Sequence, residues 1–337
     1  MPYCKALYNH VFISLTGELQ TCCRANPTQR FYFKDTTVNE FRNSDYINEV
    51  KETMQTGWHP NCEQCKLVED VGLNSAREKH NNIFSKGKEG DLTFVDMSLN
   101  NQCNISCRMC NDTISSSWGK ITGYQSSVQF DALDQIDWTK VKRIKYTGGE
   151  PFVTKEIKHI IDIAAENNII LHFNTNCTFF PEKYIDKLLS LKKVYVALSI
   201  DGIGDIAEYV RHGTNWHSAN NIIKHWLSYK DQIQFNINTC VQAYNIHQFK
   251  KIQEFADKHN TILNAEPIQD PSYFSLNALP VEYVDTVTDD VNQHYFKNYK
   301  FDNNAFEKLK LQTKYMDKLL GKSLESVNPL LASYLDK

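Results

Sequence analysis

The chain has 337 residues and a formal net charge of −3, with 37 Lys or Arg against 40 Asp or Glu. This near balance offers no strong field to nucleic acid or to an anionic membrane. Hydrophobic residues make up 41% of the chain and charged residues 23%, proportions that exclude disorder as its main state. No apolar run approaches the ~20 residues of a spanning helix, and the N-terminus lacks the pattern of a signal peptide. We therefore expect an intracellular, cytoplasmic protein that binds neither nucleic acid nor membrane.

The first 90 residues contain few long periodic runs. A strand over 11–15 and a return strand over 19–22 flank a turn at Gly17, which predicts a hairpin. Apolar residues at helical spacing predict a helix within 37–56. We expect residues 1–88 to form a small cysteine-rich domain.

From about residue 91 the pattern changes to strands that alternate with helices. Strands are predicted over 92–97, 141–146, 169–173, 194–200, 233–240 and 261–265, and helices over 157–164, 183–191, 222–227 and 246–256. Such alternation implies βαβ units and a parallel sheet. The predicted fold class is α/β: a partial (β/α)6 barrel over 90–270, short of the eight units of a closed barrel, with a helical C-terminal extension over 271–337. In a barrel of this kind, the chemistry lies at the carboxyl ends of the strands.

Ten cysteines distinguish the chain, and eight of them fall within its first 110 residues: Cys4, Cys22, Cys23, Cys62, Cys65, Cys103, Cys107 and Cys110, followed by Cys177 and Cys240. A reducing cytosol disfavours structural disulfides, so clustered cysteines there indicate metal binding. The alternative, a secreted disulfide-rich protein, fits poorly because the chain is much longer than the small scaffolds that need such bridges.

Cys103, Cys107 and Cys110 form a C-x3-C-x2-C loop directly after the first predicted barrel strand. Three thiolates on one loop suit a metal centre with three protein ligands and one open position. Iron–sulfur clusters are held by cysteine thiolates, usually four, so three ligands would leave one iron open. Zinc with a free fourth position is the alternative. From the loop alone we favour iron–sulfur over zinc.

This loop resembles the signature of the radical S-adenosylmethionine (radical SAM) superfamily, although Met109 stands where the family more often has an aromatic residue. Further segments resemble family motifs in the same order across 94–267. The resemblance assigns SAM contacts to Gly148, Gly149 and Glu150 of a GGEP segment, Asn176 of a TN segment, Ser199 and Asp201 of an SxDG segment, and Arg211 of a YxR segment. It implies that the GGEP turn meets the amino group of SAM, that SxDG reaches the ribose, and that the Arg pairs with the SAM carboxylate.

The resemblance also implies a mechanism. Cys103, Cys107 and Cys110 would hold a [4Fe-4S] cluster, and SAM would chelate its open iron. One electron, from a reductant such as flavodoxin or ferredoxin, would cleave SAM to a 5′-deoxyadenosyl radical that abstracts a substrate hydrogen. The barrel would supply position and a dry cavity.

Four cysteines before the barrel form a second set. The hairpin at Gly17 carries Cys22 back toward Cys4, and the C-x2-C pair Cys62 and Cys65 completes four ligands. On spacing alone, structural zinc is at least as plausible as a [4Fe-4S] cluster. The C-x12-G-x4-C pattern with C-x2-C resembles the twitch domain, half of a SPASM domain, which implies an auxiliary [4Fe-4S] cluster. The Gly-x4-Cys count favours Cys22 over its neighbour Cys23.

Three functions remain open from the sequence. The first is a radical SAM enzyme that modifies a peptide or protein, by analogy with SPASM and twitch relatives. The second is a radical SAM enzyme for a small molecule such as a sugar, nucleotide or cofactor precursor. The third is a zinc-stabilised binding protein without radical chemistry. Cys177 and Cys240, at predicted strand ends, could donate a hydrogen atom to a substrate radical, but a free cysteine is more often a small buried hydrophobe.

Overall fold

The computed structural model describes every residue except 71, 73, 84–89, 125–131 and 337. Contacts within the chain divide it into two compact units. The first unit comprises Met1–Gln102, Ser126–Phe173 and Lys183–Val194, and the second comprises Cys103–Gln125, Asn174–Glu182 and Tyr195–Lys337. None of the described helices has the length and apolar character needed to cross a membrane.

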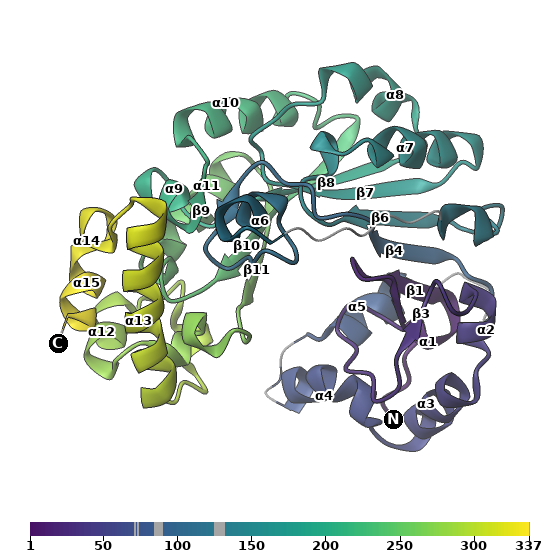
Figure 1. Ribbon diagram of the computed structural model, residues 1–337, viewed down its shortest axis with the longest axis horizontal. Coiled ribbons are helices and arrows are strands. Elements are labelled where there is room, and N and C mark those ends of the chain that lie inside the picture. The colour runs from purple at the N-terminus through teal and green to yellow at the C-terminus, as the bar shows by residue number, and fades with distance from the viewer. Residues whose placement is uncertain (71, 73, 84–89, 125–131, 337) are drawn as a thin grey trace. The chain divides into compact units, whose positions relative to one another are not determined.

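The first unit is built on a mostly parallel sheet (Figure 1). Its central strands are β4 (Phe94–Ser98), β6 (Arg143–Thr147) and β7 (Ile170–Thr175), and each runs parallel to the next, with Phe94 opposite Arg143 and Arg143 opposite Ile170. All five residues of β4 are buried, including Asp96, whose carboxylate lies 3.1 Å from Lys145 Nζ on β6. A buried carboxylate needs such a partner, because an unpaired charge inside a protein is costly. The parallel sheet and α/β class expected from the sequence are confirmed.

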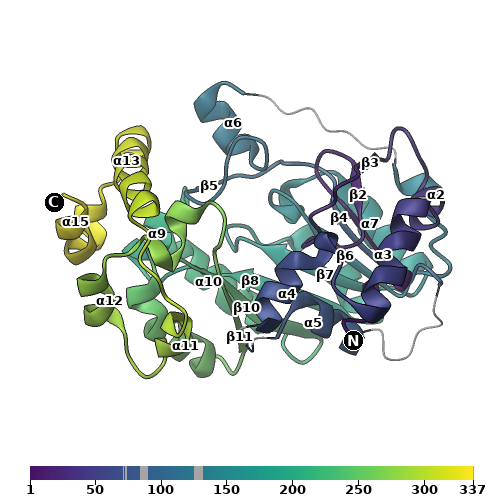
Figure 2. The same cartoon turned by 90° about the horizontal axis from the view of Figure 1, so that it is seen from below.

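The N-terminal hairpin extends this sheet (Figure 2). β1 (His10–Ile13) pairs in parallel with β4, whereas β2 (Glu18–Gln20) and β3 (Phe31–Tyr32) follow it as antiparallel strands. Gly17 has φ of 79°, a conformation that glycine adopts without strain, and it occupies the turn between β1 and β2.

The helices of the first unit begin at recognisable caps. A single helix was expected within 37–56, but the structure contains two, α2 (Val38–Arg42) and α3 (Asp45–Thr56). The break occurs because Ser44 is extended and its hydroxyl accepts the Ile47 N–H, which starts a new helix. The remaining α-helices of this unit are α1 (Ala6–Asn9), α4 (Glu63–Asp70), α5 (Ala76–Ile83), α7 (Glu156–Glu166) and α8 (Ile185–Ser190), and its short 3-10 turns are Pro60–Cys62, Ala132–Gln135 and Pro151–Val153.

The second unit contains the later strands and their helices. β10 (Ile233–Val241) runs parallel to β11 (Ile262–Pro267), and the Ile200 N–H, just after β8 (Val194–Ser199), donates to Asn238 of β10 (2.9 Å). A separate two-stranded sheet pairs β5 (Ser106–Cys107) with β9 (Arg211–His212). The helices that accompany these strands are α6 (Ser116–Thr122), α9 (Asp205–Val210), α10 (Trp216–Leu227) and α11 (Phe249–Lys258).

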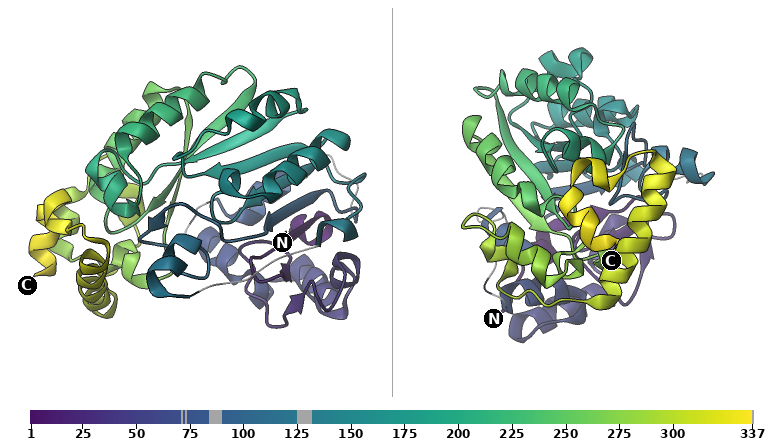
Figure 3. Two further views of the ribbon diagram at one scale, coloured as in Figure 1. Left: turned by 45° about the horizontal axis from the view of Figure 1, so that its top comes forward. Right: turned by 90° about the vertical axis from the view of Figure 1, so that its left-hand side faces the viewer.

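The C-terminal extension is helical, as its sequence predicts (Figure 3). It contains α12 (Val281–Val287), α13 (Asn303–Leu320), α14 (Leu324–Val327) and α15 (Pro329–Leu335). The buried faces of these helices share one hydrophobic core with the strand ends, in which Leu309 and Met316 of α13 pack with Tyr209, Tyr244 and Phe274. The extension is therefore an integral part of the second unit.

Candidate functional site

The loop that carries Cys103, Cys107 and Cys110 lies in the second unit and is fixed by the short β5–β9 pairing, in which Cys107 stands opposite Arg211. The Cys110 N–H donates to the Cys107 carbonyl (2.9 Å), and the indole Nε1 of Trp118 on α6 donates to the same oxygen (2.7 Å). Cys107 and Cys110 therefore occupy one tight turn, whose shape depends on α6 and β9.

Two of the three thiols interact directly. A hydrogen bond with Cys110 and burial raise the pKa of the Cys107 thiol well above its usual value, whereas Arg211 opposes that rise. Arg211 Nη1 lies 3.8 Å from Cys107 Sγ. A thiol must lose its proton to ligate a metal. The Arg211 charge is therefore placed where it stabilises the thiolate form.

Asp201 and Arg211 form a buried ion pair beside this loop. Asp201, at the end of β8, is 0% exposed, and its Oδ2 lies 2.8 Å from Arg211 Nε. Its Oδ1 accepts the N–H of Cys240 (2.7 Å), and Asn245 Nδ2 donates to its carbonyl (3.0 Å). Burial lowers the pKa of Arg211, but the Asp201 carboxylate outweighs this effect, so the pKa lies above its ordinary value. The guanidinium therefore stays charged inside the unit.

Asn176 also reaches the cysteine loop. It follows β7, and its Nδ2 donates to Asn104 Oδ1 (2.9 Å) and lies 3.9 Å from Cys103 Sγ. Ser199 is the last residue of β8 and is half-buried. The second unit therefore brings the three cysteines together with Asn176, Asp201 and Arg211.

Gly148, Gly149 and Glu150 form a turn in the first unit, directly after β6. A Cβ on Gly149 would lie 1.9 Å from the carbonyl oxygen of Gln102, and the Glu150 N–H donates to that same oxygen (2.7 Å). Gly148 has φ of 94°, which favours glycine. Glu150 is 1% exposed, and its Oε1 accepts the N–H of Phe152. The two glycines thus allow the turn after β6 to pack against the turn after β4.

Four cysteines of the first unit line one cavity of about 20 Å³: Cys4, Cys22, Cys62 and Cys65. Burial raises the pKa of Cys4 to about 11 and that of Cys62 to about 12, and in both cases Cys65 raises it further. Cys23 is exposed and does not line the cavity. Within the described part of the chain, no three His, Cys, Asp or Glu side chains converge in the arrangement that holds a single metal ion.

Arg77 of α5 also lines this cavity, within the segment 69–77 that the sequence suggested as a brace for the four-cysteine site. Its Nε and Nη2 donate to the two carboxylate oxygens of Glu69 (2.8 and 2.6 Å), and Nη1 donates to the Tyr3 carbonyl (2.9 Å). A guanidinium fixed in this way places a positive charge beside the thiols, and it lowers the pKa of Cys4 and Cys62.

The remaining cysteines differ in environment. Cys177 is buried with φ of 61°, and its Sγ donates to the Thr175 carbonyl (3.6 Å). Cys240 is exposed, and its register partner on β11 is Glu266. Of these two, Cys240 is the thiol that solvent reaches.

Sequence reasoning also missed Arg108 and Asp317. Arg108, between two cysteines of the loop, is 0% exposed and forms an ion pair with Asp317 at the end of α13 (2.8 Å). The one signal in the sequence was an arginine within a cysteine loop, because no sequence pattern connects Arg108 with Asp317, which lies much later in the chain.

Comparison with known proteins shows which proteins the chain resembles. Residues 97–256 match the model of the radical SAM superfamily. The mycofactocin maturase MftC of Mycobacterium ulcerans is 25% identical over 182 residues, covering 53% of this chain and 48% of the relative. The pre-heme d1 synthase of Dinoroseobacter shibae is 29% identical over 113 residues, covering 33% of this chain and 27% of the relative. The chain thus spans about half the length of the MftC relatives or less.

Among solved structures, anSMEcpe with bound AdoMet is similar at 18% identity with a TM-score of 0.44, covering 68% of this chain and 65% of that one. SuiB of Streptococcus suis is similar at 14% identity with a TM-score of 0.43, covering 92% and 67%. The family match spans β4 through α11, the segment that contains the cysteine loop and the strand ends described above. Residues 97–256 are therefore similar to the radical SAM superfamily, and over this segment the chain resembles radical SAM enzymes.

Proposed function

We propose that Cys103, Cys107 and Cys110 hold a [4Fe-4S] cluster that binds SAM. The geometry of the cysteine loop carries this proposal: Cys107 and Cys110 share one tight turn and hydrogen-bond each other, and a buried guanidinium lies 3.8 Å from the Cys107 sulfur. These donors fit a thiolate-bound group with net negative charge. When bound, such a cluster would supply the one-electron reduction of SAM on which radical chemistry at a substrate C–H bond depends.

The protein's own residues then have definite tasks. Asp201 holds Arg211 through Nε, which orients the guanidinium toward the cysteine loop and the SAM carboxylate. Asn176 braces the loop at Asn104. Ser199 and Asp201 provide polar groups at the end of β8 for the ribose. We assign the amino group of SAM to the turn of Gly148, Gly149 and Glu150, as the family resemblance implies.

We further propose that Cys4, Cys22, Cys62 and Cys65 hold an auxiliary [4Fe-4S] cluster. These four thiols line one cavity, and Arg77 adds a compensating positive charge. Four thiolates form a closed ligand set, so this centre would transfer electrons rather than bind substrate. Structural zinc is the competing occupant. A one-electron reductant such as flavodoxin or ferredoxin completes the proposed system.

The proposed substrate is a peptide or protein. Support comes from the similarity to mycofactocin maturases. A small-molecule substrate is the second candidate, supported by the match to a pre-heme d1 synthase. Incubation with candidate peptides and with tetrapyrrole precursors, followed by mass spectrometry, separates the two.

The first experiment measures iron, sulfide and zinc after anaerobic reconstitution. About eight irons are expected in the wild type, about four in the Cys103/Cys107/Cys110→Ala variant, and about four in the Cys62/Cys65→Ala variant. Dithionite-dependent release of 5′-deoxyadenosine should be lost in the Cys103/Cys107/Cys110→Ala variant and retained in the Cys62/Cys65→Ala variant. Stoichiometric zinc with little iron would instead support the zinc-stabilised binding protein. Four irons, all lost in the first variant, would leave the auxiliary set to zinc.

A further inference from the structure

Arg108 lies on the cysteine loop between Cys107 and Cys110, yet its side chain is 0% exposed and is held by residues far along the chain. Its Nε donates to the Tyr209 carbonyl (2.9 Å), and its Nη2 donates to the Lys322 carbonyl (3.1 Å) and lies 2.8 Å from Asp317 Oδ1. The guanidinium carbon lies 3.6 Å from the centre of the Tyr209 ring. The backbone N–H of Arg108 is also engaged, since it donates to Val210 (2.8 Å).

Asp317 is equally committed. Its Oδ1 accepts the Tyr209 hydroxyl (2.8 Å) as well as the guanidinium, and its Oδ2 accepts the Leu324 N–H (2.7 Å). Asp317 lies in the last turn of α13, where the negative end of the helix dipole disfavours a carboxylate. The partners of Asp317 explain a carboxylate at this unfavourable position, and among the described residues Arg108 is the one cation that forms an ion pair with it.

The C-terminal helices and the cysteine loop are therefore joined by an ion pair between the fully buried Arg108 and the half-buried Asp317. Figures 2 and 3 show α13 and its neighbours as the last part of the chain, and their inner faces belong to the same core as Tyr209 and Tyr244. Buried charge pairs are strongly coupled, because removing one partner leaves the other charge without compensation in a medium of low dielectric. The position of the segment between Cys107 and Cys110 thus depends on Asp317.

We infer that Arg108 and Asp317 are positioning residues for the SAM-binding cluster, and that the C-terminal extension acts through them as the platform of the cysteine loop. The inference rests on the proposed function, in which Cys107 and Cys110 are cluster ligands. Neither residue needs to touch the cluster or SAM. Their task is to keep the two ligand thiols at a fixed separation and orientation.

The test uses the full-length reconstituted protein and follows iron loss to a chelator under anaerobic conditions. Asp317→Asn keeps the shape of the side chain and removes its charge, so Arg108 is left buried and unpaired. Iron should leave the cysteine loop at least about tenfold faster than in the wild type. The auxiliary site should lose iron at the wild-type rate, and the electron paramagnetic resonance signal that responds to added SAM should broaden or decline.

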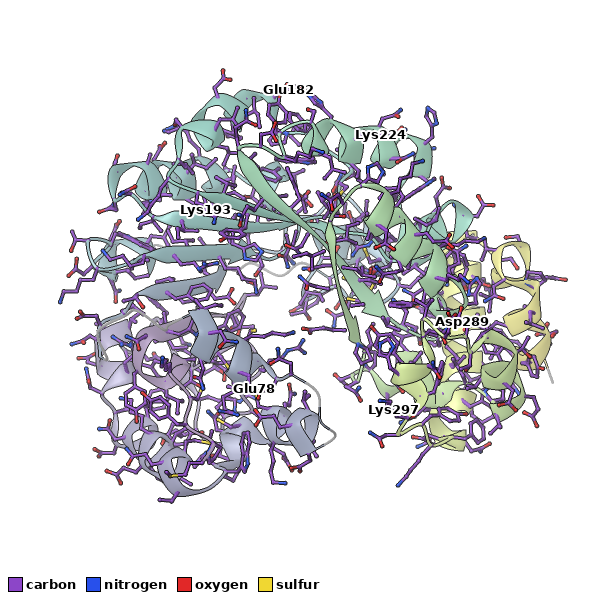
Figure 4. All side chains as sticks on the ribbon, turned by 180° about the vertical axis from the view of Figure 1, so that it is seen from behind. Glu78, Glu182, Lys193, Lys224, Asp289 and Lys297 are labelled. Carbon is purple, nitrogen blue, oxygen red and sulfur yellow. The ribbon has the colours of Figure 1, made fainter. Side chains whose placement is uncertain are left out.

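The double variant Arg108→Met/Asp317→Leu supplies the decisive comparison. It removes both charges and fills the site with apolar groups, so it should lose iron more slowly than Asp317→Asn alone. General damage to the fold predicts the opposite order, since two substitutions would then do more harm than one. Asp336→Asn is the matched control: it removes a charge from the same helical extension, but its carboxylate is 71% exposed and 3.7 Å from Lys314. Lys297→Met, at an exposed lysine labelled in Figure 4, controls for loss of a cation.

Hydrogen exchange of the protein before reconstitution gives a readout that needs no cluster. Asp317→Asn should increase exchange in residues 103–110 as well as in α13, whereas Asp336→Asn should leave residues 103–110 unchanged. If the double variant fails to fold, the comparison of Asp317→Asn with Asp336→Asn still tests the inference. Wild-type iron retention and wild-type exchange in Asp317→Asn would overturn the inference. If the Cys107→Ala variant binds as much iron as the wild type, the proposed function itself fails. This result distinguishes failure of the proposed function from failure of the inference about Arg108 and Asp317.

Discussion

At Gly149 a neighbouring stretch of backbone leaves no room for a side chain. It has φ of 28°, and the atom that a Cβ would meet is a main-chain oxygen, that of Gln102, at 1.9 Å. A backbone oxygen cannot swing away as the end of a flexible side chain can. The GGEP resemblance marked this residue for its contact with SAM, and the structure adds a packing requirement that exists without any cofactor.

Gly149→Ala should lower the free energy of unfolding by more than about 1 kcal/mol, because the substitution adds a clash to an unfavourable φ. Denaturant titration of the protein without cofactor measures this loss. Gly57→Ala is the matched control, since its Cβ would meet nothing within 4 Å and its φ of −154° suits any residue. Equal stability of the two variants would show that the turn relaxes freely.

Two histidines, the buried His10 and the half-buried His80, give the first unit a defined response to pH. Burial lowers the pKa of His10 to about 4 and that of His80 to about 3. Both imidazoles are therefore neutral in the folded protein, whereas in the unfolded chain they take up a proton near pH 6.5. The unfolded state then binds more protons than the folded state at any pH between these values.

Stability should be constant with respect to these groups above about pH 6.5 and should fall as the pH drops from there toward about 4. Each histidine contributes a slope of up to about 1.4 kcal/mol per pH unit in that window. Urea titrations at pH 7, 6 and 5 measure the slope. His10→Phe should reduce it, because Phe keeps the ring packing on Phe94 without a titrating nitrogen. His217→Gln, at an exposed histidine, should leave the slope unchanged.

At the scale of elements, the hydrophobic pattern located the strands because burial is a local property of each of them: it alternates along β6 and β7 and is continuous along β4. The predicted strands 92–97, 141–146 and 169–173 correspond to β4, β6 and β7 within two residues at either end. The two-residue strands β5 and β9 were not predictable, because they exist only through their pairing with each other. The helix expected within 37–56 was wrong as a single element, since an N-cap at Ser44 divides it.

Ser44→Ala should therefore lower the free energy of unfolding by about 1 kcal/mol, the usual cost of losing a serine N-cap. The Ser44 hydroxyl accepts the Ile47 N–H, and α3 carries Met54, which lines the four-cysteine cavity. Thermal denaturation measures the loss. Ser333→Ala, at an exposed position inside α15, should be neutral or slightly stabilising because alanine is the better helix former. A loss of the same size at Ser333 would remove capping as the explanation.

At the scale of the whole molecule, the N-terminal segment bears on domain organisation. A boundary between residues 1–88 and a barrel starting at 90 remains a prediction from composition. β1 nevertheless pairs in parallel with β4 over four residues, from His10 opposite Phe94 to Ile13 opposite Met97. A strand placed between β2 and β4 in this way shares its ladder of hydrogen bonds with both neighbours.

Native-state hydrogen exchange tests how far this pairing unites the two segments. The amides that β1 and β4 direct at each other should exchange with the same opening free energy, because breaking the ladder between the two strands exposes both sets. Amides of α5, a helix without a buried residue, provide an internal reference for local opening. If β1 opened far more readily than β4, the N-terminal segment would behave as an independent domain.

The sequence by itself determined the features that depend on local order: the alternation of strands and helices, the two sets of cysteines, and the polar residues that follow each strand. These features are fixed by periodicity and spacing along one stretch of chain. Tertiary structure alone decided the partners of those residues. Arg108 reaches across 214 positions to the Lys322 carbonyl, Arg211 is held by Asp201, and Arg77 joins the four-cysteine cavity. The sequence does not show where a charged side chain points. Only packing in the folded protein removes water from the charged group and determines which partner neutralises it.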